Sequence, residues 1–206
     1  MFCSQCGKEA QEEAKFCSHC GVPVAFELNH DAEMSSWTVT SQVIVKNLSK
    51  VRKAWFEQAM RMIQASGEKI INDRLEGLAD YALKGYQYFM VIGILHRYIP
   101  SEKGKNFSDI LFTTICGSEM DEVLKYFSRY MEPGEDEGGQ SLMRFCNDLA
   151  RHITGNEHPL EAGLAVGEIA PPFILMTEIS VADAFGDKEG VAKVQQGLDD
   201  LLAKNK

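Results

Sequence analysis

The sequence predicts a mainly α-helical protein, in which a bundle-like domain of several helices follows a small cysteine-rich module. Three observations predict this class. From about Ser41 onward, apolar residues recur every three or four positions, which is the period of an α-helix buried on one face. Apolar residues make up 45% of the 206-residue chain, enough for a packed core. Four of the six cysteines stand in two short pairs before residue 21.

A six-residue pattern, Phe-Cys-Ser-x-Cys-Gly, occurs at residues 2–7 and again at residues 16–21. Two cysteines separated by two residues can place both sulfurs on one zinc ion, about 2.3 Å away. The two pairs together supply four thiolates, from Cys3, Cys6, Cys17 and Cys20. Four thiolates complete a tetrahedral shell and leave no position for water or substrate. The sequence therefore predicts one structural Zn²⁺ and no catalytic metal.

Metal binding also explains how so short a module can fold. Residues 1–24 are too few to fold by burial of apolar surface alone. Zinc binding contributes on the order of 10 kcal/mol in peptides of this kind, which supplies the missing stability. Two disulfides would instead need an oxidising compartment, and a redox pair would need a single motif. His19 lies inside the second pair and is an alternative ligand.

The repeated pattern resembles the short zinc-ribbon family found at the N-termini of many bacterial proteins. The resemblance covers residues 1–24 and implies that the two cysteine pairs lie on short β-hairpins, or knuckles. It also implies that the module contacts other macromolecules. The two lysines of this segment are outnumbered by its three glutamates, and a zinc ion with four thiolates adds two negative charges. Because this charge repels phosphate, we expect contact with protein, and nucleic acid is an unlikely partner.

Three segments follow from these patterns: a zinc ribbon at residues 1–24, a linker at residues 25–40 and an all-α domain at residues 41–206. The linker is predicted because its residues are polar and show no helical period. Glu27 and His30 form one Glu-x-x-His, the half-motif of di-iron bundles, and chance explains a single copy.

The helices of the third segment are predicted from apolar period, glycines and prolines. We expect them at residues 41–66, 68–99, 108–116, 118–130, 141–153, 159–170, 173–185 and 188–203. A polar turn is expected at residues 101–107 and an acidic loop at residues 132–139. Gly77, Gly85 and Gly93 fall inside the predicted helix at residues 68–99, and such glycines are tolerated best where another helix backbone comes close. Gly163 and Gly167 likewise form a small face that allows close helix packing.

Candidate sites in the helical domain are few. The first helix carries a basic stripe on its exposed side, interrupted by Glu57 and formed by Lys46, Lys50, Lys53 and Arg61. A carboxylate–histidine metal site is a hypothesis for His158, Glu161 and Glu168 with Glu178 or Asp183, because the first three share a helix face. Cys146 and His152 are a further hypothesis, for a nucleophile and its base, but a spacing of six residues puts them on different faces of a helix. For each, a solvated surface or a buried thiol is the simpler interpretation.

Charge and cysteine usage limit the function. The formal net charge of −9 disfavours a general nucleic-acid binder. The N-terminus has no secretory signal, and the longest apolar run is too short to span a membrane. We therefore expect a cytoplasmic, non-enzymatic adaptor or regulatory protein that acts through protein–protein contacts and possible homo-oligomers. The alternatives are a nucleic-acid-associated regulator that uses the basic stripe, and a helical enzyme or ligand-binding domain with an unrecognised pocket.

Overall fold

The structure, a computed structural model, describes residues 28–132 and 140–204 of the chain. All regular secondary structure in these residues is helical, as the sequence predicts. The chain divides into two compact units, Met1–Trp37 and Thr38–Lys206, and the second unit contains the helical domain. The predicted ribbon and most of the predicted acidic loop lie outside the described residues.

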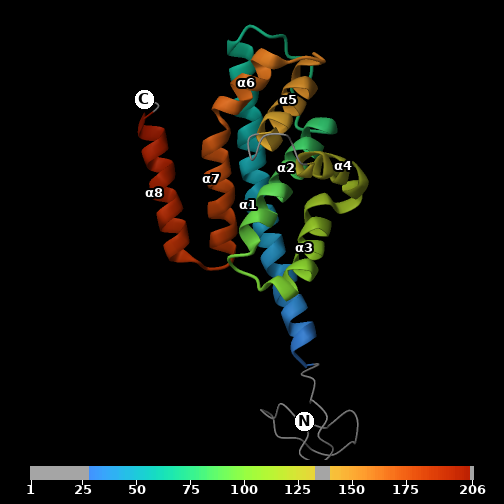
Figure 1. Cartoon of the computed structure of the whole chain (residues 1–206), viewed down its shortest axis with the longest axis vertical. Helices are drawn as coiled ribbons and strands as arrows, with labels where there is room; N and C mark the ends of the chain where they lie inside the picture. Colours follow the sequence, from blue (N-terminus) through green and yellow to red (C-terminus); the bar gives the residue numbers. More distant parts are fainter. Residues whose placement is uncertain (1–27, 133–139, 205–206) are drawn as a thin grey trace, which may run out of the picture. The chain divides into compact units, whose positions relative to one another are not determined.

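Figure 1 shows the helices in chain order. Their bounds are α1 Leu28–Ala65, α2 Leu78–Leu95, α3 Ser101–Cys116, α4 Met120–Met131, α5 Gln140–Thr154, α6 Leu160–Glu168, α7 Ala170–Ala184 and α8 Lys188–Lys204. A short 3-10 turn, η1, covers Gly117–Glu119 between α3 and α4. The predicted ends of the helices that became α5, α6 and α8 are correct to within two residues.

Helix α1 begins at Leu28, so the prediction of a linker over residues 25–40 is wrong for residues 28–40. No glycine or proline occurs between residues 28 and 66, so nothing in the backbone interrupts the helix. The side chains of residues 33–40 are all exposed or half-buried. A helix with no buried face has no apolar period, which is why the pattern did not reveal this part.

Helix α2 begins at Leu78, and the predicted first part of that helix, from residue 68, is a loop. Gly67 and Gly77 stand at the two ends of this loop with φ of +86° and +57°, values that favour glycine. Between them the backbone N–H groups of Ile71 and Asn72 donate to the carbonyl oxygen of Ile153, with N···O distances of 2.9 and 3.1 Å. These bonds to the end of α5 replace the helical ones.

The prolines mark the starts of two helices. Helix α3 begins at Ser101, directly after Pro100, where we predicted a polar turn up to residue 107. The first turns of α3 are largely exposed, so they carry no apolar period. Helix α7 takes Pro171 and Pro172 into its first turn, where a missing backbone N–H costs no helical bond.

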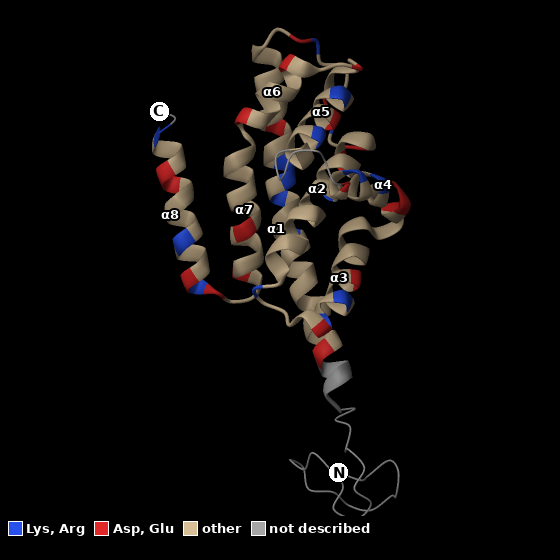
Figure 2. Cartoon of the chain, viewed as in Figure 1, with Lys and Arg blue, Asp and Glu red and all other residues tan. Residues whose placement is uncertain are grey.

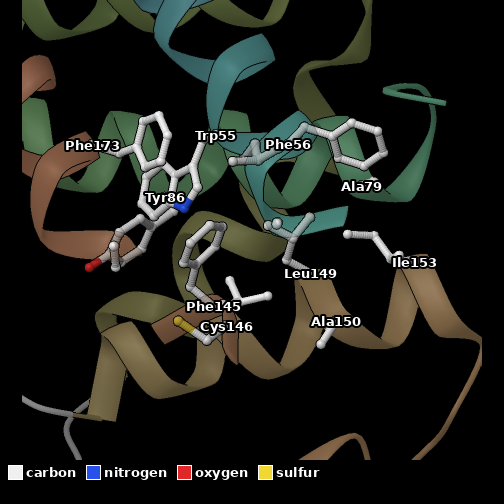
Figure 3. Close-up of a cluster of buried hydrophobic side chains, with 14 of the residues drawn as sticks. Trp55, Phe56, Ala79, Tyr86, Phe145, Cys146, Leu149, Ala150, Ile153 and Phe173 are labelled. Carbon is white, nitrogen blue, oxygen red and sulfur yellow. The ribbon is translucent and has the colours of Figure 1, made fainter. Parts of the chain in front are cut away.

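The core lies where α1, α2, α5 and α7 meet (Figure 3). Trp55 of α1 is fully buried, and its ring stacks on Phe173 of α7 with a centroid distance of 5.2 Å. The same ring meets Phe145 of α5 edge-on at 4.8 Å. Tyr86 of α2 stacks on Phe145 at 4.3 Å. The predicted apolar face of α1 is buried from Ile44 to Ala59, so this helix stands at the centre of the domain.

Two glycines allow helices to approach closely. A Cβ atom built on Gly85 of α2 would lie 2.8 Å from the Cβ of Tyr126 and 3.0 Å from the backbone nitrogen of Phe127 in α4. A Cβ atom on Gly163 of α6 would lie 2.1 Å from Oδ1 of Asn147 in α5. The predicted close packing is confirmed at Gly85, and Gly163 leaves room for the side chain of Asn147. The prediction is wrong for Gly77 and Gly93, because a Cβ atom on either would meet nothing within 4 Å, and Gly77 precedes α2 with a positive φ.

None of the described helices, taken alone, has both the length and the apolar character needed to cross a bilayer. Helices α6 and α7 meet these limits only as a pair, with a bend of 49° between them.

Candidate functional site

The predicted zinc ligands lie outside the described residues, so the spacing of the sequence alone supports them: Cys3, Cys6, Cys17 and Cys20. The same holds for His19 and for the side chains of the single Glu-x-x-His at residues 27–30.

The two remaining cysteines behave as buried thiols, as predicted. Cys116 and Cys146 are free and buried, and burial raises the pKa of each thiol to about 12. Both are therefore protonated at neutral pH and are weak nucleophiles. The hypothesis that pairs Cys146 with His152 is wrong, because His152 Nε2 shares a hydrogen bond of 2.7 Å with the hydroxyl of Tyr126.

A buried carboxylate ties α4 to α5. The side chain of Asp148 is 1% exposed, with Arg129 Nε 3.1 Å from Oδ2 and Arg151 Nη1 3.3 Å from Oδ1. Burial raises the pKa of Asp148 above its usual range, and the two guanidinium groups oppose that rise. The arrangement is a structural ion-pair cluster between two helices.

His152 belongs to the same region and is held neutral. Burial, followed by the charges of Arg151 and Arg129, lowers the pKa of His152 to about 4. Burial also raises the pKa of Tyr126, its hydrogen-bonding partner, to about 12. At neutral pH this pair is therefore an uncharged contact between α4 and α5.

We expect the helical domain to lose stability as the pH falls from about 6.5 to about 4. The unfolded chain protonates His152 near pH 6.5 and the folded chain only near pH 4, so the unfolded state binds more protons in this window. After allowance for partial exposure of the ring, the loss is about 2 kcal/mol. Urea unfolding of the full chain, followed by far-UV circular dichroism from pH 4 to pH 7.5, measures it.

His152→Gln is expected to flatten this pH dependence relative to the natural chain, whereas His158→Gln, at an exposed position, leaves it unchanged. Zinc and the carboxylates contribute equally to the pH dependence of stability in the natural chain and in both variants, so their contributions cancel when the curves are subtracted. Parallel curves for His152→Gln and the natural chain would contradict the assignment.

A second buried cluster joins α1 to α2 and η1. Arg52 Nε lies 2.8 Å from Asp80 Oδ1, and Lys84 Nζ lies 2.8 Å from Asp80 Oδ2. Lys84 also pairs with Glu119. Burial acts to lower the pKa of Lys84, but its bonds to the two carboxylates raise it overall. Gln87 Nε2 donates to the carbonyl oxygen of Leu48 at 3.0 Å, which completes the tie between α1 and α2.

The hypothesis of a carboxylate–histidine metal site is wrong. Over residues 28–132 and 140–204, no three His, Cys, Asp or Glu side chains lie close enough to hold a metal ion. Glu178, one of the proposed ligands, forms an ion pair with Arg97 of the turn after α2. Asp183, the other, accepts a hydrogen bond of 3.5 Å from the amide of Asn47 in α1. His158, Glu161 and Glu168 are exposed.

An apolar hollow runs between α1, α7 and α8, and sequence reasoning missed it. It consists of two adjoining cavities of about 480 and 490 Å³, which share Ala54, Met176 and Leu198. We call it the α1–α7–α8 groove. In Figure 1, α7 has α8 on one side and α1 on the other. The lining of α1 extends from Asn47 to Arg61, which corresponds to about 21 Å at 1.5 Å per residue.

The basic stripe of α1 borders this groove. Its four members are exposed, and Lys50 and Arg61 line the groove directly. Within the described part of the chain, none of the four forms an ion pair with a carboxylate. Figure 2 shows both charges along α1 and α8, whereas the charged positions of α7 are all acidic. On the α1 side the lining has Lys50 and Arg61 with Glu57 between them, and Lys46 and Lys53 are exposed on the same helix outside the lining, so this side of the groove has a net positive charge.

Comparisons with known proteins address the N-terminal segment. The family of zinc-ribbon domains matches residues 2–24, which contain both cysteine pairs. No curated protein and no solved structure matches the chain. The family match implies zinc binding, in agreement with the four-thiolate pattern. The chain therefore carries an N-terminal zinc-ribbon domain at residues 2–24.

Proposed function

We propose that this protein is an adaptor or regulatory protein that acts through protein–protein contacts, with the ribbon and the helical domain each binding a partner. The α1–α7–α8 groove carries the proposal. It is apolar along its floor, and it is long enough for about four turns of a helix. Open apolar grooves of this size are typical sites for an amphipathic helix.

The polar groups of the groove are suited to binding. The hydroxyl of Ser180 donates to the carbonyl oxygen of Met176 at 2.8 Å, and Asn47 donates to Asp183. Neither side chain is poised as a nucleophile or a base, because each already serves a structural bond. The strongly buried charged groups of the domain, Asp148 and Lys84, lie in the structural clusters on other helices.

The second candidate function is regulation through nucleic acid. The four exposed, unpaired cations of the basic stripe favour it, since phosphate neutralisation needs such a row. Glu57 within the row and the net charge of −9 weaken it. Salt-dependent retardation of a short DNA or RNA duplex, lost in Lys46→Glu/Lys53→Glu, would support this candidate over the adaptor.

Photo-cross-linking in the native host tests the adaptor proposal. A photoreactive amino acid replaces Gln58 or Gln195, which line the groove, or Lys105, which is exposed on α3. We expect a discrete protein adduct from the two groove positions, identified by mass spectrometry and absent at Lys105. A Cys17→Ser version should keep the groove adduct but lose any partner held by the ribbon. Equal labelling at all three positions would overturn the proposal.

A further inference from the structure

We infer that the α1–α7–α8 groove binds an acidic amphipathic helix of a separate protein partner, with its apolar stripe on α7 and its carboxylates against α1. This inference rests on the proposed function, because it names the kind of partner that the groove would hold. Three features of the groove carry it: the shape of the floor, the charge along one side and the length between its ends.

The floor fits the apolar stripe of a helix. Met176 and Ile179 of α7 are only half-buried, and Leu202 of α8 is 46% exposed. These side chains face the groove together with Ala54 of α1, whose small size leaves room between the flanking helices. A partner helix laid over α7 would remove this apolar surface from water, which is the main driving force for such a contact.

The charge on the α1 side of the groove favours an acidic partner. Between residues 46 and 61 the basic stripe has four exposed cations against the one carboxylate of Glu57; Lys50 and Arg61 line the groove, and so does Glu57. By contrast, Arg52, Arg129 and Arg151 elsewhere in the domain are already paired with aspartates. Carboxylates on a bound helix would lie well within a Debye length of about 10 Å from the stripe, so they would be attracted at moderate salt.

The ends of the groove refine the expected partner. Asp183 lines one end and Glu168 the other, so negative charge flanks the cations. Glu57 also lines the groove, between Lys50 and Arg61, so the carboxylates of a bound helix are best placed opposite those two cations, about three turns apart. This pattern of charges favours one register of the bound helix along the groove, as well as an acidic helix over a basic one.

A second copy of the chain fits the groove less well. Its helix α6 is acidic and exposes Leu160 and Leu164, but it has nine residues, about 13 Å. The groove is longer than that. Helix α8 has the length but carries three cations against three carboxylates. Neither combines the length with the negative charge that the basic stripe favours.

Synthetic peptides test the inference on the full, zinc-loaded chain. The probe is a helical peptide of about 14 residues, or four turns, with leucines on one face and, beside them, glutamates about three turns apart that can face Lys50 and Arg61. Its twin carries lysines in place of the glutamates, and a third peptide has the probe's composition in scrambled order. Binding is measured by fluorescence anisotropy at low and at physiological salt, together with sedimentation of the chain alone.

We expect the acidic probe to bind and both other peptides to bind at least about tenfold more weakly. Lys50→Glu/Arg61→Glu should weaken the probe about tenfold, since two surface attractions become repulsions. Lys69→Glu/Lys105→Glu, the same charge change at exposed positions outside the groove, should leave it within about twofold. Ala54→Trp, which fills the groove, should abolish binding, and circular dichroism verifies that each variant keeps its helices.

Several results would overturn the inference. The lysine twin could bind as tightly as the acidic probe, or the Lys50→Glu/Arg61→Glu variant could bind the probe unchanged. Self-association abolished by Ala54→Trp would assign the groove to a second copy, and displacement of the probe by an oligonucleotide would assign the stripe to nucleic acid. If groove cross-links to a protein persist in the host while the lysine twin is preferred, the adaptor function stands and only the charge of the occupant is wrong.

Discussion

Replacing Cys17 with serine is expected to remove zinc from the purified chain, from one ion per chain to none, and to leave the helical domain folded. Cys17 is one of four predicted thiolates, and a closed shell that loses one of them no longer meets the tetrahedral preference of Zn²⁺. The ribbon then loses a binding free energy on the order of 10 kcal/mol, which no apolar core replaces. The helical domain has its own compact core, so its unfolding should hardly change.

Metal analysis and denaturant unfolding measure the two halves of this prediction separately. Cys6→Ser tests the other pair and should behave as Cys17→Ser does. Cys116→Ala, which removes a buried thiol of α3, should keep the full zinc content. Zinc retained in Cys17→Ser but lost in Cys17→Ser/His19→Ala would show that His19 can serve as a ligand. Zinc retained in every cysteine variant would refute the site.

Replacing Trp55 with alanine is expected to destabilise the helical domain by about 3–5 kcal/mol, a large part of the stability of an ordinary domain. The ring is 0% exposed and contacts Phe173, Phe145 and Tyr86, so its loss opens a cavity between α1, α2, α5 and α7. The aromatic geometry is lost together with the buried area. Urea unfolding should show a lower midpoint with an unchanged slope.

Two control variants give the stability losses with which that of Trp55→Ala is compared. Trp55→Phe keeps an aromatic ring in place, and it removes an indole N–H that meets no acceptor among the described residues. It should therefore cost only about 1–2 kcal/mol. Leu160→Ala, at a position 65% exposed, should cost less than about 0.5 kcal/mol. A Trp55→Ala variant as stable as Leu160→Ala would mean that the described core does not hold the four helices together.

Local pattern predicted much of the helical domain because a buried helix face leaves a period in the sequence. The face of α1 from Ile44 to Ala59 is one example, and the ends of α5 and α8 are others. Gly85 was also understood from sequence, since a glycine within a helix is costly unless a neighbour needs the space. In each case the residues of one segment were enough to predict the structure of that segment.

The elements that were predicted wrongly are those whose own segment carries no signal for the observed structure. Residues 33–40 of α1 are helical although none of them is buried, so periodicity could not detect them. The loop before α2 has enough apolar residues to resemble a helix, but Ile71 and Asn72 bond to the end of α5, about 80 residues away in sequence. Three of the proposed metal ligands were expected on one helix face, but His158 precedes α6, and Glu178 of α7 forms an ion pair with Arg97.

By itself, the sequence predicted the zinc-ribbon module, which the family match supports, and the helical class of the residues that the structure describes. Both predictions are local: ligand spacing sets the expected coordination shell, and the apolar period sets the helix. Only the tertiary structure decided that the basic stripe of α1 borders an apolar groove, and that His152 meets Tyr126 of α4. Those pairings depend on how separate helices pack, because side chains far apart along the chain become neighbours only through the contacts of the whole core.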